Sequence, residues 1–154
     1  MILLGIDWAR SKHDALIMDP AGRVVQRPTL PHDAQGLQRL ADAVAVHEPE
    51  PSRVRVAVEM HDGGLLAWLL DRGYAVVGVN PKSAQRARDR DRPAGGKDDA
   101  SDAFILADML RTDRGSLRTI RPDEDATLEL RSLVELRDAR VQERTALFQR
   151  LRAR

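Results

Sequence analysis

Two acidic residues close two apolar runs, and this pattern constrains the fold more than any other feature of the chain. Asp7 follows the run at residues 2–6, and Glu59 follows the run at 54–58. Short apolar runs that end at a polar position are typical of buried strands. A carboxylate just past a buried strand is costly unless water, a partner or a metal ion satisfies it. We therefore expect a sheet with acidic side chains at the ends of two of its strands.

The remaining hydrophobic pattern predicts three strands followed by helices that alternate with two further strands. Strands are expected at 2–7, 13–19, 23–29, 53–58 and 74–79, with a turn at 20–23. Helices are expected at 34–46, from 63–64 to a stop at Gly73, at 82–90 and at 99–110. Three antiparallel strands followed by helix-connected strands form a mixed sheet with helices on its faces. This α/β order, with five strands, is that of an RNase H-like fold.

The C-terminal part of the chain has a different composition. Residues 113–122 are polar and end in proline, so we expect a linker there after a first domain at 1–112. Residues 123–154 are expected to form one long helix, capped by an aspartate and rich in leucine, valine, arginine and glutamate. A single isolated helix cannot bury all of these apolar positions. We expect a coiled-coil arm through which the chain self-associates, with a seam interrupted by Arg137 and Arg144.

The sequence lacks cysteine, a long apolar run and a signal peptide, and these absences exclude some kinds of metal site and some cellular locations. The chain contains no cysteine, which excludes disulfides and thiolate metal sites and favours a reducing interior. No apolar run approaches the roughly 20 residues that a membrane span needs. The N-terminus lacks the basic start and long apolar stretch of a signal peptide. We expect a cytoplasmic protein without a membrane anchor.

A further pair of acidic residues lies at the start of the helix predicted at 99–110. Asp99 and Asp102 are three positions apart, so both side chains point from one face of that helix. Carboxylates gathered from these elements and from the two strand ends would repel one another, and a hard cation is the usual remedy. Two Mg²⁺ (or Mn²⁺) ions about 4 Å apart activate the nucleophile and stabilise the leaving oxygen when a phosphodiester is broken. The order of these acids predicts such a site.

The four carboxylates would divide the coordination between them. Asp7 is expected as the bridging ligand, with Glu59 and Asp102 as outer ligands. Asp99 is expected as a further ligand or as a base that positions water. Each residue alone also has a simpler interpretation, because aspartates at a helix N-terminus act as caps or as favourable charge. Asp98 could replace Asp99 as the ligand.

A basic segment adjoins the predicted acidic site. Between residues 81 and 97, six basic residues occur against two acidic ones. The planar fork of arginine suits phosphate oxygens, and we expect this segment to contact a nucleic-acid backbone. An ordinary charged helix face is the alternative, and Lys97 could also balance the acidic cluster. The candidates for phosphate contact, including one lysine after the first strand, are Lys12, Lys82, Arg86, Arg88, Arg90, Arg92 and Lys97.

Four motifs in order resemble the DEDD transposases of the IS110 group of insertion sequences. They lie at residues 5–14, 58–64, 79–82 and 97–103. The last resembles the family's Lys-Thr-Asp-x-x-Asp-Ala motif, with Asp98 at the threonine position, and so favours Asp99 over Asp98 as the ligand. Residues 60–62 depart from the family's usual sequence. This departure affects the expected form of the loop after Glu59, and it leaves the Glu59 carboxylate as a candidate ligand.

The resemblance implies a RuvC-like form of the RNase H fold, with Mg²⁺ at Asp7, Glu59, Asp99 and Asp102, followed by a coiled-coil arm. It implies cut-and-join chemistry on the DNA of an insertion element, guided by a structured RNA. It also implies a second domain with a catalytic serine, before which this chain ends. We expect the N-terminal catalytic domain of a transposase or recombinase. The alternatives are a RuvC-like junction or RNA nuclease, and a nucleic-acid-binding and dimerisation module that is inactive without the serine domain.

Overall fold

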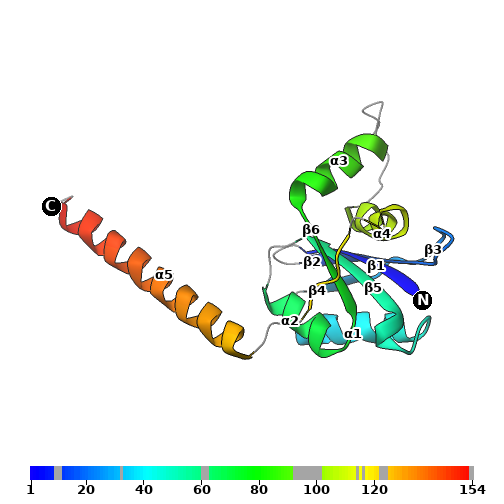
Figure 1. The fold of residues 1–154 in the computed structure, drawn as a ribbon, viewed down its shortest axis with the longest axis horizontal. Coiled ribbons are helices and arrows are strands. Elements are labelled where there is room, and N and C mark those ends of the chain that lie inside the picture. Colours follow the sequence, from blue (N-terminus) through cyan, green and yellow to red (C-terminus); the bar gives the residue numbers. More distant parts are fainter. Residues whose placement is uncertain are drawn as a thin grey trace. The chain divides into compact units, whose positions relative to one another are not determined.

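The computed structural model describes residues 1–8, 12–31, 33–59, 63–91, 102–113, 115, 117–121 and 125–152. The chain divides into two compact units, Met1–Ile120 and Arg121–Arg154 (Figure 1). The first unit extends past the boundary expected at residue 112. The amide of Ile120 donates to the carbonyl oxygen of Val76 at 2.7 Å, and Thr119 forms a bridge with Val77. Part of the expected linker therefore lies along the sheet.

A mixed six-stranded sheet forms the centre of the first unit. Its strands are β1 (Ile2–Asp7), β2 (Lys12–Met18), β3 (Val24–Gln26), β4 (Thr29–Pro31), β5 (Val54–Glu59) and β6 (Ala75–Val79). The order is β3-β2-β1-β5-β6, and β4 also pairs with β2. Strand β1 is antiparallel to β2 and parallel to β5, and β5 is parallel to β6. The structure confirms the mixed sheet and the adjacency of the two strands that end in Asp7 and Glu59.

The single strand expected at 23–29 is wrong, because the structure contains two short strands there. Arg27 and Pro28 separate β3 from β4. Proline has no amide hydrogen to donate to a strand ladder, so continuous pairing cannot run through residue 28. The Pro28 carbonyl oxygen still accepts from the Ala15 amide at 2.9 Å, so the segment stays against β2. The sheet consequently has six strands and not five.

Helices cover both faces of this sheet (Figure 1). They are α1 (Ala34–Ala45), α2 (Gly63–Asp71), α3 (Pro81–Asp91) and α4 (Asp102–Thr112), and a 3-10 turn, η1, spans Pro51–Arg53. Because side chains alternate along a strand, β1 serves two cores. Leu4 and Ile6 pack in the cluster that contains residues of α1 and α2. Leu3 packs in the cluster with α3 and α4.

Local sequence signals set several helix boundaries as expected. The Asp33 side chain accepts from the Gly36 amide at 2.7 Å and caps α1. The Asn80 side chain accepts from the Lys82 amide at 2.9 Å at the start of α3. After α2, Gly73 adopts a φ of 81°, a left-handed conformation that suits glycine and ends the helix.

Helix α4 packs directly on β1 at Gly5. A Cβ atom at this position would collide with the carbonyl oxygen of Ala103 and would lie 2.7 Å from the Ala107 amide nitrogen. The absence of a side chain lets the helix backbone approach the strand backbone. Since Ala103 follows Asp102 directly, this contact holds the first residue of α4 close to the strand end at Asp7.

The second unit consists of α5 (Asp125–Arg152), a helix of 28 residues. This confirms the helix expected there, whereas its expected cap at Asp123 lies outside the described residues. Large apolar side chains are exposed along it, namely Leu133, Val134, Leu136, Val141 and Phe148. No helix in the described part of the chain combines the length and the apolar character needed to cross a membrane.

Candidate functional site

Three carboxylates form a row across one end of the sheet. Asp14 of β2 lies directly opposite Asp7 of β1 in the antiparallel pair, so both side chains leave the same face. Glu59 comes one residue after the pair between Ile6 and Val58 on the neighbouring parallel strand. The row faces α3 and α4, because Ala57, two residues before Glu59, packs in the core cluster that contains those helices.

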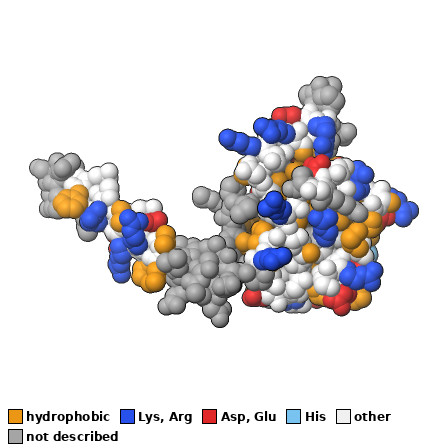
Figure 2. Space-filling view, viewed as in Figure 1, with side chains coloured by type: hydrophobic (Ala, Val, Ile, Leu, Met, Phe, Trp, Pro, Cys, Tyr) orange, Lys and Arg blue, Asp and Glu red, His pale blue; other side chains and the backbone are white. Residues whose placement is uncertain are grey.

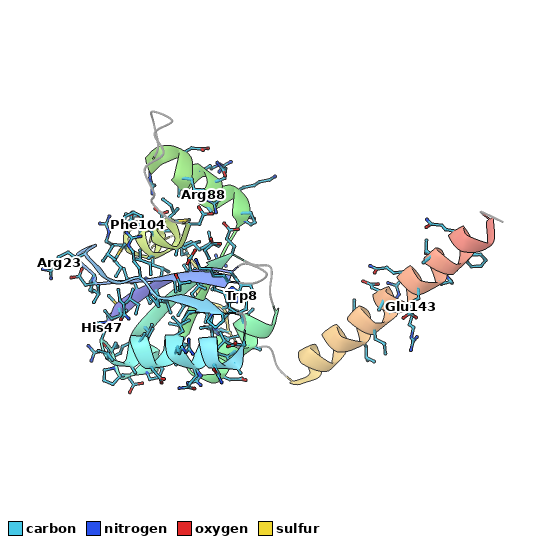
Figure 3. All side chains as sticks on the ribbon, turned by 180° about the vertical axis from the view of Figure 1, so that it is seen from behind. Trp8, Arg23, His47, Arg88, Phe104 and Glu143 are labelled. Atoms are coloured by element: carbon cyan, nitrogen blue, oxygen red, sulfur yellow. The ribbon has the colours of Figure 1, made fainter. Side chains whose placement is uncertain are left out.

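Asp102 and Arg88 complete the cluster from above the sheet. Asp102 is the first residue of α4. Arg88 of α3 donates from Nη2 to Glu59 Oε1 at 2.6 Å and from Nε to Asp102 Oδ1 at 2.8 Å. One guanidinium therefore joins a strand-end carboxylate to a helix-start carboxylate. Figure 3 shows Arg88 on α3 and Trp8 just past the end of β1.

The electrostatics of Asp7 show that these acids act on one another. Burial raises the pKa of Asp7 above its ordinary value of 3.8, and the charges of Asp102, Glu59 and Asp14 raise it further. Arg88 opposes this rise. Burial disfavours the charge of Arg88, but its hydrogen bonds to Asp102 and Glu59 outweigh that effect and raise the guanidinium pKa. Among these interacting groups, four carboxylates lie against one guanidinium, and the cluster keeps surplus negative charge.

Asp14 was not among the residues singled out from the sequence. Its Oδ1 accepts from the Thr29 hydroxyl at 2.9 Å, so a neighbour on β4 orients it. The signal that could have identified it is the hairpin register, since pairing of β1 with β2 places residues 7 and 14 opposite each other. From the sequence alone, Arg88 is a candidate for phosphate contact, and its ion pairs with the acids are visible only in the structure.

Trp8 and His13 pack together near the same strand ends. The His13 side chain is fully buried, and its ring stacks on Trp8 with centroids 3.3 Å apart and planes 2° apart. Residues of β2 on the same side of the strand, Ala15 and Ile17, belong to the core cluster shared with α1 and α2. The stack thus lies on the opposite face from the carboxylates and supports the backbone that follows Asp7.

The structure brings together three of the four predicted acidic ligands, namely Asp7, Glu59 and Asp102. The fourth, Asp99, lies outside the described residues, as do Asp98, Arg92 and Lys97. The other basic candidates, Lys12 at the start of β2 and Lys82, Arg86 and Arg90 of α3, have exposed side chains. Figure 2 shows lysine and arginine side chains gathered over α3.

The donor set of the cluster suits a hard divalent cation. Mg²⁺ and Mn²⁺ prefer carboxylate and water oxygens, and carboxylates with surplus charge are the only donors that the described cluster offers. Among the described residues, no three acidic or histidine side chains already surround a common point. Arg88 instead forms ion pairs with two of the acids, Glu59 and Asp102. The residues fit the ion by the chemistry of their oxygen donors.

The chain is similar to known proteins over most of its length. The model of the IS110-type DEDD family, described as "Transposase", matches residues 4–154. The chain is 33% identical over 150 residues to "Putative transposase y4uE" of Sinorhizobium fredii, covering 96% of this chain and 42% of that protein. It is 34% identical over 125 residues to "Mini-circle putative transposase for IS117" of Streptomyces coelicolor, covering 80% of this chain and 30% of that protein. The chain thus spans less than half the length of these relatives.

A solved structure shows the same fold. The chain is similar to T. thermophilus RuvC, determined in complex with a Holliday junction substrate, with a TM-score of 0.52 and 16% sequence identity. The match covers 78% of this chain and 99% of that one. At this identity the likeness concerns the fold alone. It confirms the expected RuvC-like arrangement of sheet and helices.

Proposed function

Since this chain belongs to the DEDD transposases of the IS110 group, we propose that its first unit is the metal-dependent catalytic domain through which such an enzyme acts on DNA phosphodiesters. The observation that carries the proposal is the convergence of Asp7, Glu59 and Asp102 at one end of the sheet, with surplus negative charge between them. Carboxylates from separate elements meet the need of a hard cation for several oxygen ligands.

The proposed ligands have distinct roles. Asp7, on the central strand, would bridge two Mg²⁺ or Mn²⁺ ions, and Glu59 and Asp102 would each bind on an outer side. Asp99 is proposed as a further ligand or as a residue that positions water. When bound, such ions lower the pKa of an attacking water or hydroxyl and stabilise the leaving oxygen. The protein supplies a fixed arrangement, because Gly5 lets α4 hold Asp102 against the strand ends.

The basic side chains of α3 are proposed to position the DNA backbone. Lys82, Arg86 and Arg90 are exposed on the helix that also carries Arg88 into the acidic cluster. Contacts to phosphates fix the register of a nucleic acid without reading its sequence. A backbone held along α3 would therefore present a phosphodiester near the carboxylates. Lys12, Arg92 and Lys97 are proposed as additional contacts, and a structured guide RNA, suggested by the family resemblance, as a second nucleic-acid partner.

Helix α5 is proposed as a self-association surface. Val134, Val141 and Phe148 recur every seven residues, as one seam of a coiled coil does, and are 47%, 38% and 58% exposed. Arg137 and Arg144 lie in the same heptads and weaken the seam without removing it. Sedimentation of the chain beside a version ending at Ile120 tests this proposal. A larger assembly for the chain alone supports it, and two monomers would reject it.

Calorimetric titration with Mg²⁺ and Mn²⁺ tests the proposed function. Asp7→Ala should weaken binding by at least the roughly 10- to 100-fold that mutation of a residue supporting a metal ligand typically costs. Asp71→Ala, at an exposed position on α2, is the matched control and should bind as the unmodified chain does. Equal binding by all three proteins would refute the metal site. Nicking assays on duplex, branched and RNA-bound DNA then distinguish a transposase domain from a junction nuclease and from a binding module.

A further inference from the structure

Arg88 makes its two strongest contacts to two proposed metal ligands. Its hydrogen bonds to Glu59 and Asp102 are 2.6 and 2.8 Å long, and its side chain is 19% exposed. Hydrogen bonds between charged groups are short and roughly twice as strong as neutral ones. The neighbouring arginines of α3, Arg86 and Arg90, are exposed instead. The charge of Arg88 thus lies within the acidic cluster, whereas the side chains of Arg86 and Arg90 are exposed.

These contacts also attach α3 to two neighbouring elements. Among the described side chains of this helix, only Ala84 and Ala87 are buried. An alanine side chain is a single methyl group and removes little apolar surface from water. Arg88, by contrast, connects α3 to the end of β5 through Glu59 and to the start of α4 through Asp102. Loss of its ion pairs would therefore remove the connections of α3 to Glu59 and Asp102.

The same carboxylate oxygens cannot serve the guanidinium and a divalent ion equally well. Mg²⁺ binds its ligands at about 2.0–2.1 Å and requires near-octahedral geometry. A guanidinium hydrogen-bonded to the same carboxylates would lie only a few ångströms from that ion, and like charges repel strongly at such a distance in a partly buried site.

We propose that Arg88 is an internal counter-cation, which occupies the acidic site in the absence of metal and leaves Glu59 and Asp102 when a divalent ion binds. This inference rests on the proposed function, because it needs the metal at Asp7, Glu59 and Asp102. Its consequence is that metal binding loosens α3 from β5 and α4. The released guanidinium then lies on the helix proposed to contact DNA, where a phosphate is a suitable partner. Metal binding and phosphate binding are coupled through one side chain.

Metal titration of two arginine variants tests the competition. Arg88→Gln should bind Mn²⁺ about 5- to 150-fold more tightly than the unmodified chain, the usual range for coupled binding events. Arg39→Gln removes the same charge from an exposed position on α1, outside the proposed metal and DNA contacts, and is the matched control. Its affinity should stay close to that of the unmodified chain. Equal or weaker binding by Arg88→Gln would overturn the proposal.

Removal of a positive charge alone could strengthen metal binding, so a second measurement follows α3 itself. In hydrogen exchange monitored by mass spectrometry, addition of Mg²⁺ to the unmodified chain should speed exchange in α3 while it slows exchange in β1, β5 and α4. In Arg88→Gln, α3 should exchange fast from the start and should not respond to Mg²⁺. Unchanged or slowed exchange of α3 in the unmodified chain would overturn the proposal, and this readout decides even if the variant does not fold.

The outcomes separate this inference from the proposed function. If Asp7→Ala loses metal binding while Arg88→Gln binds as the unmodified chain does, the metal site is supported and the role of Arg88 is refuted. If Arg88→Gln binds metal and the unmodified chain does not, Arg88 is the competitor and the inference is supported. If neither binds metal, both proposals fail.

Discussion

Replacement of Gly5 by alanine tests how α4 is held beside β1. The added methyl would collide with the Ala103 carbonyl oxygen and lie 2.7 Å from the Ala107 nitrogen. Both are backbone atoms of α4, so no side-chain rotation can relieve the contact. A Cβ normally lies at ordinary van der Waals distance from its neighbours, and the helix must therefore move outward by roughly 1 Å.

The expected cost follows from what the helix buries. The buried residues of α4 are Ala103, Ile105, Leu106, Ala107, Met109 and Leu110. A gap of 0.5–1 Å forfeits about a quarter to a half of the attraction between facing atoms, and overpacking of a core typically costs about 1–3 kcal/mol. Alanine offsets about 0.5–1 kcal/mol of this, because glycine loses more freedom in a strand. We expect a net loss of about 1–2 kcal/mol, or roughly 4–8 °C in the Tm of a unit this size.

Chemical denaturation and metal titration together form the assay. Gly115→Ala is the control, because a Cβ at that position meets nothing within 4 Å, and its effect should stay within about 0.5 kcal/mol. Gly5→Ala should also bind Mn²⁺ more weakly, since the displaced helix carries Asp102 away from Asp7. Wild-type stability together with wild-type metal affinity for Gly5→Ala would refute the view that this backbone contact positions Asp102.

Three further predictions concern the site, a cap and the basic helix. In EDTA at pH 7, Asp7→Asn should raise the free energy of unfolding, because burial and neighbouring acids raise the Asp7 pKa and make its charge costly in the folded state. The gain should shrink as the pH falls through the raised pKa and disappear below the ordinary value of 3.8; a gain independent of pH would contradict this. Asp33→Ala, which removes the cap on the Gly36 amide, should cost about 1 kcal/mol in denaturation, whereas Asp42→Ala on the exposed side of α1 should not. Glutamine at Lys82, Arg86 and Arg90 should weaken DNA binding and lower the salt slope by about one for each phosphate that is no longer neutralised; an unchanged slope would exclude α3 as a DNA surface.

The strand ends of the site could be predicted because their signal is local. Asp7 and Glu59 each end an apolar run, and buried strands with this order of helices pair in few ways. Asp102 could be placed at a helix start from its spacing to the apolar positions that follow. The break at Pro28 could also have been predicted, since the missing amide hydrogen is visible in the sequence. The strand predicted at 23–29 runs through Pro28 because the flanking valines and leucine favour strand on both sides.

The role of Arg88 depends on packing that local spacing does not reveal. Arg86, Arg88 and Arg90 look equivalent as a run of alternating charges. Only the rotation of α3 that buries Ala84 and Ala87 turns Arg88 inward, and these positions share a helix face by their spacing of three and four. The small-residue face indicates from the sequence which side of α3 is buried. The sequence does not indicate the partners Glu59 and Asp102, because the tertiary fold sets how their elements approach α3.

A crystal structure of the chain grown with Mn²⁺ and measured for anomalous scattering would show whether the three carboxylates hold the metal. Ions located this way require no assumption about the ligands. We expect anomalous density bounded by Asp7, Glu59 and Asp102, with the Arg88 guanidinium turned away from both of its acidic partners. Millimolar Mn²⁺ that leaves no density among these carboxylates, or that binds elsewhere while Arg88 keeps both ion pairs, would contradict it.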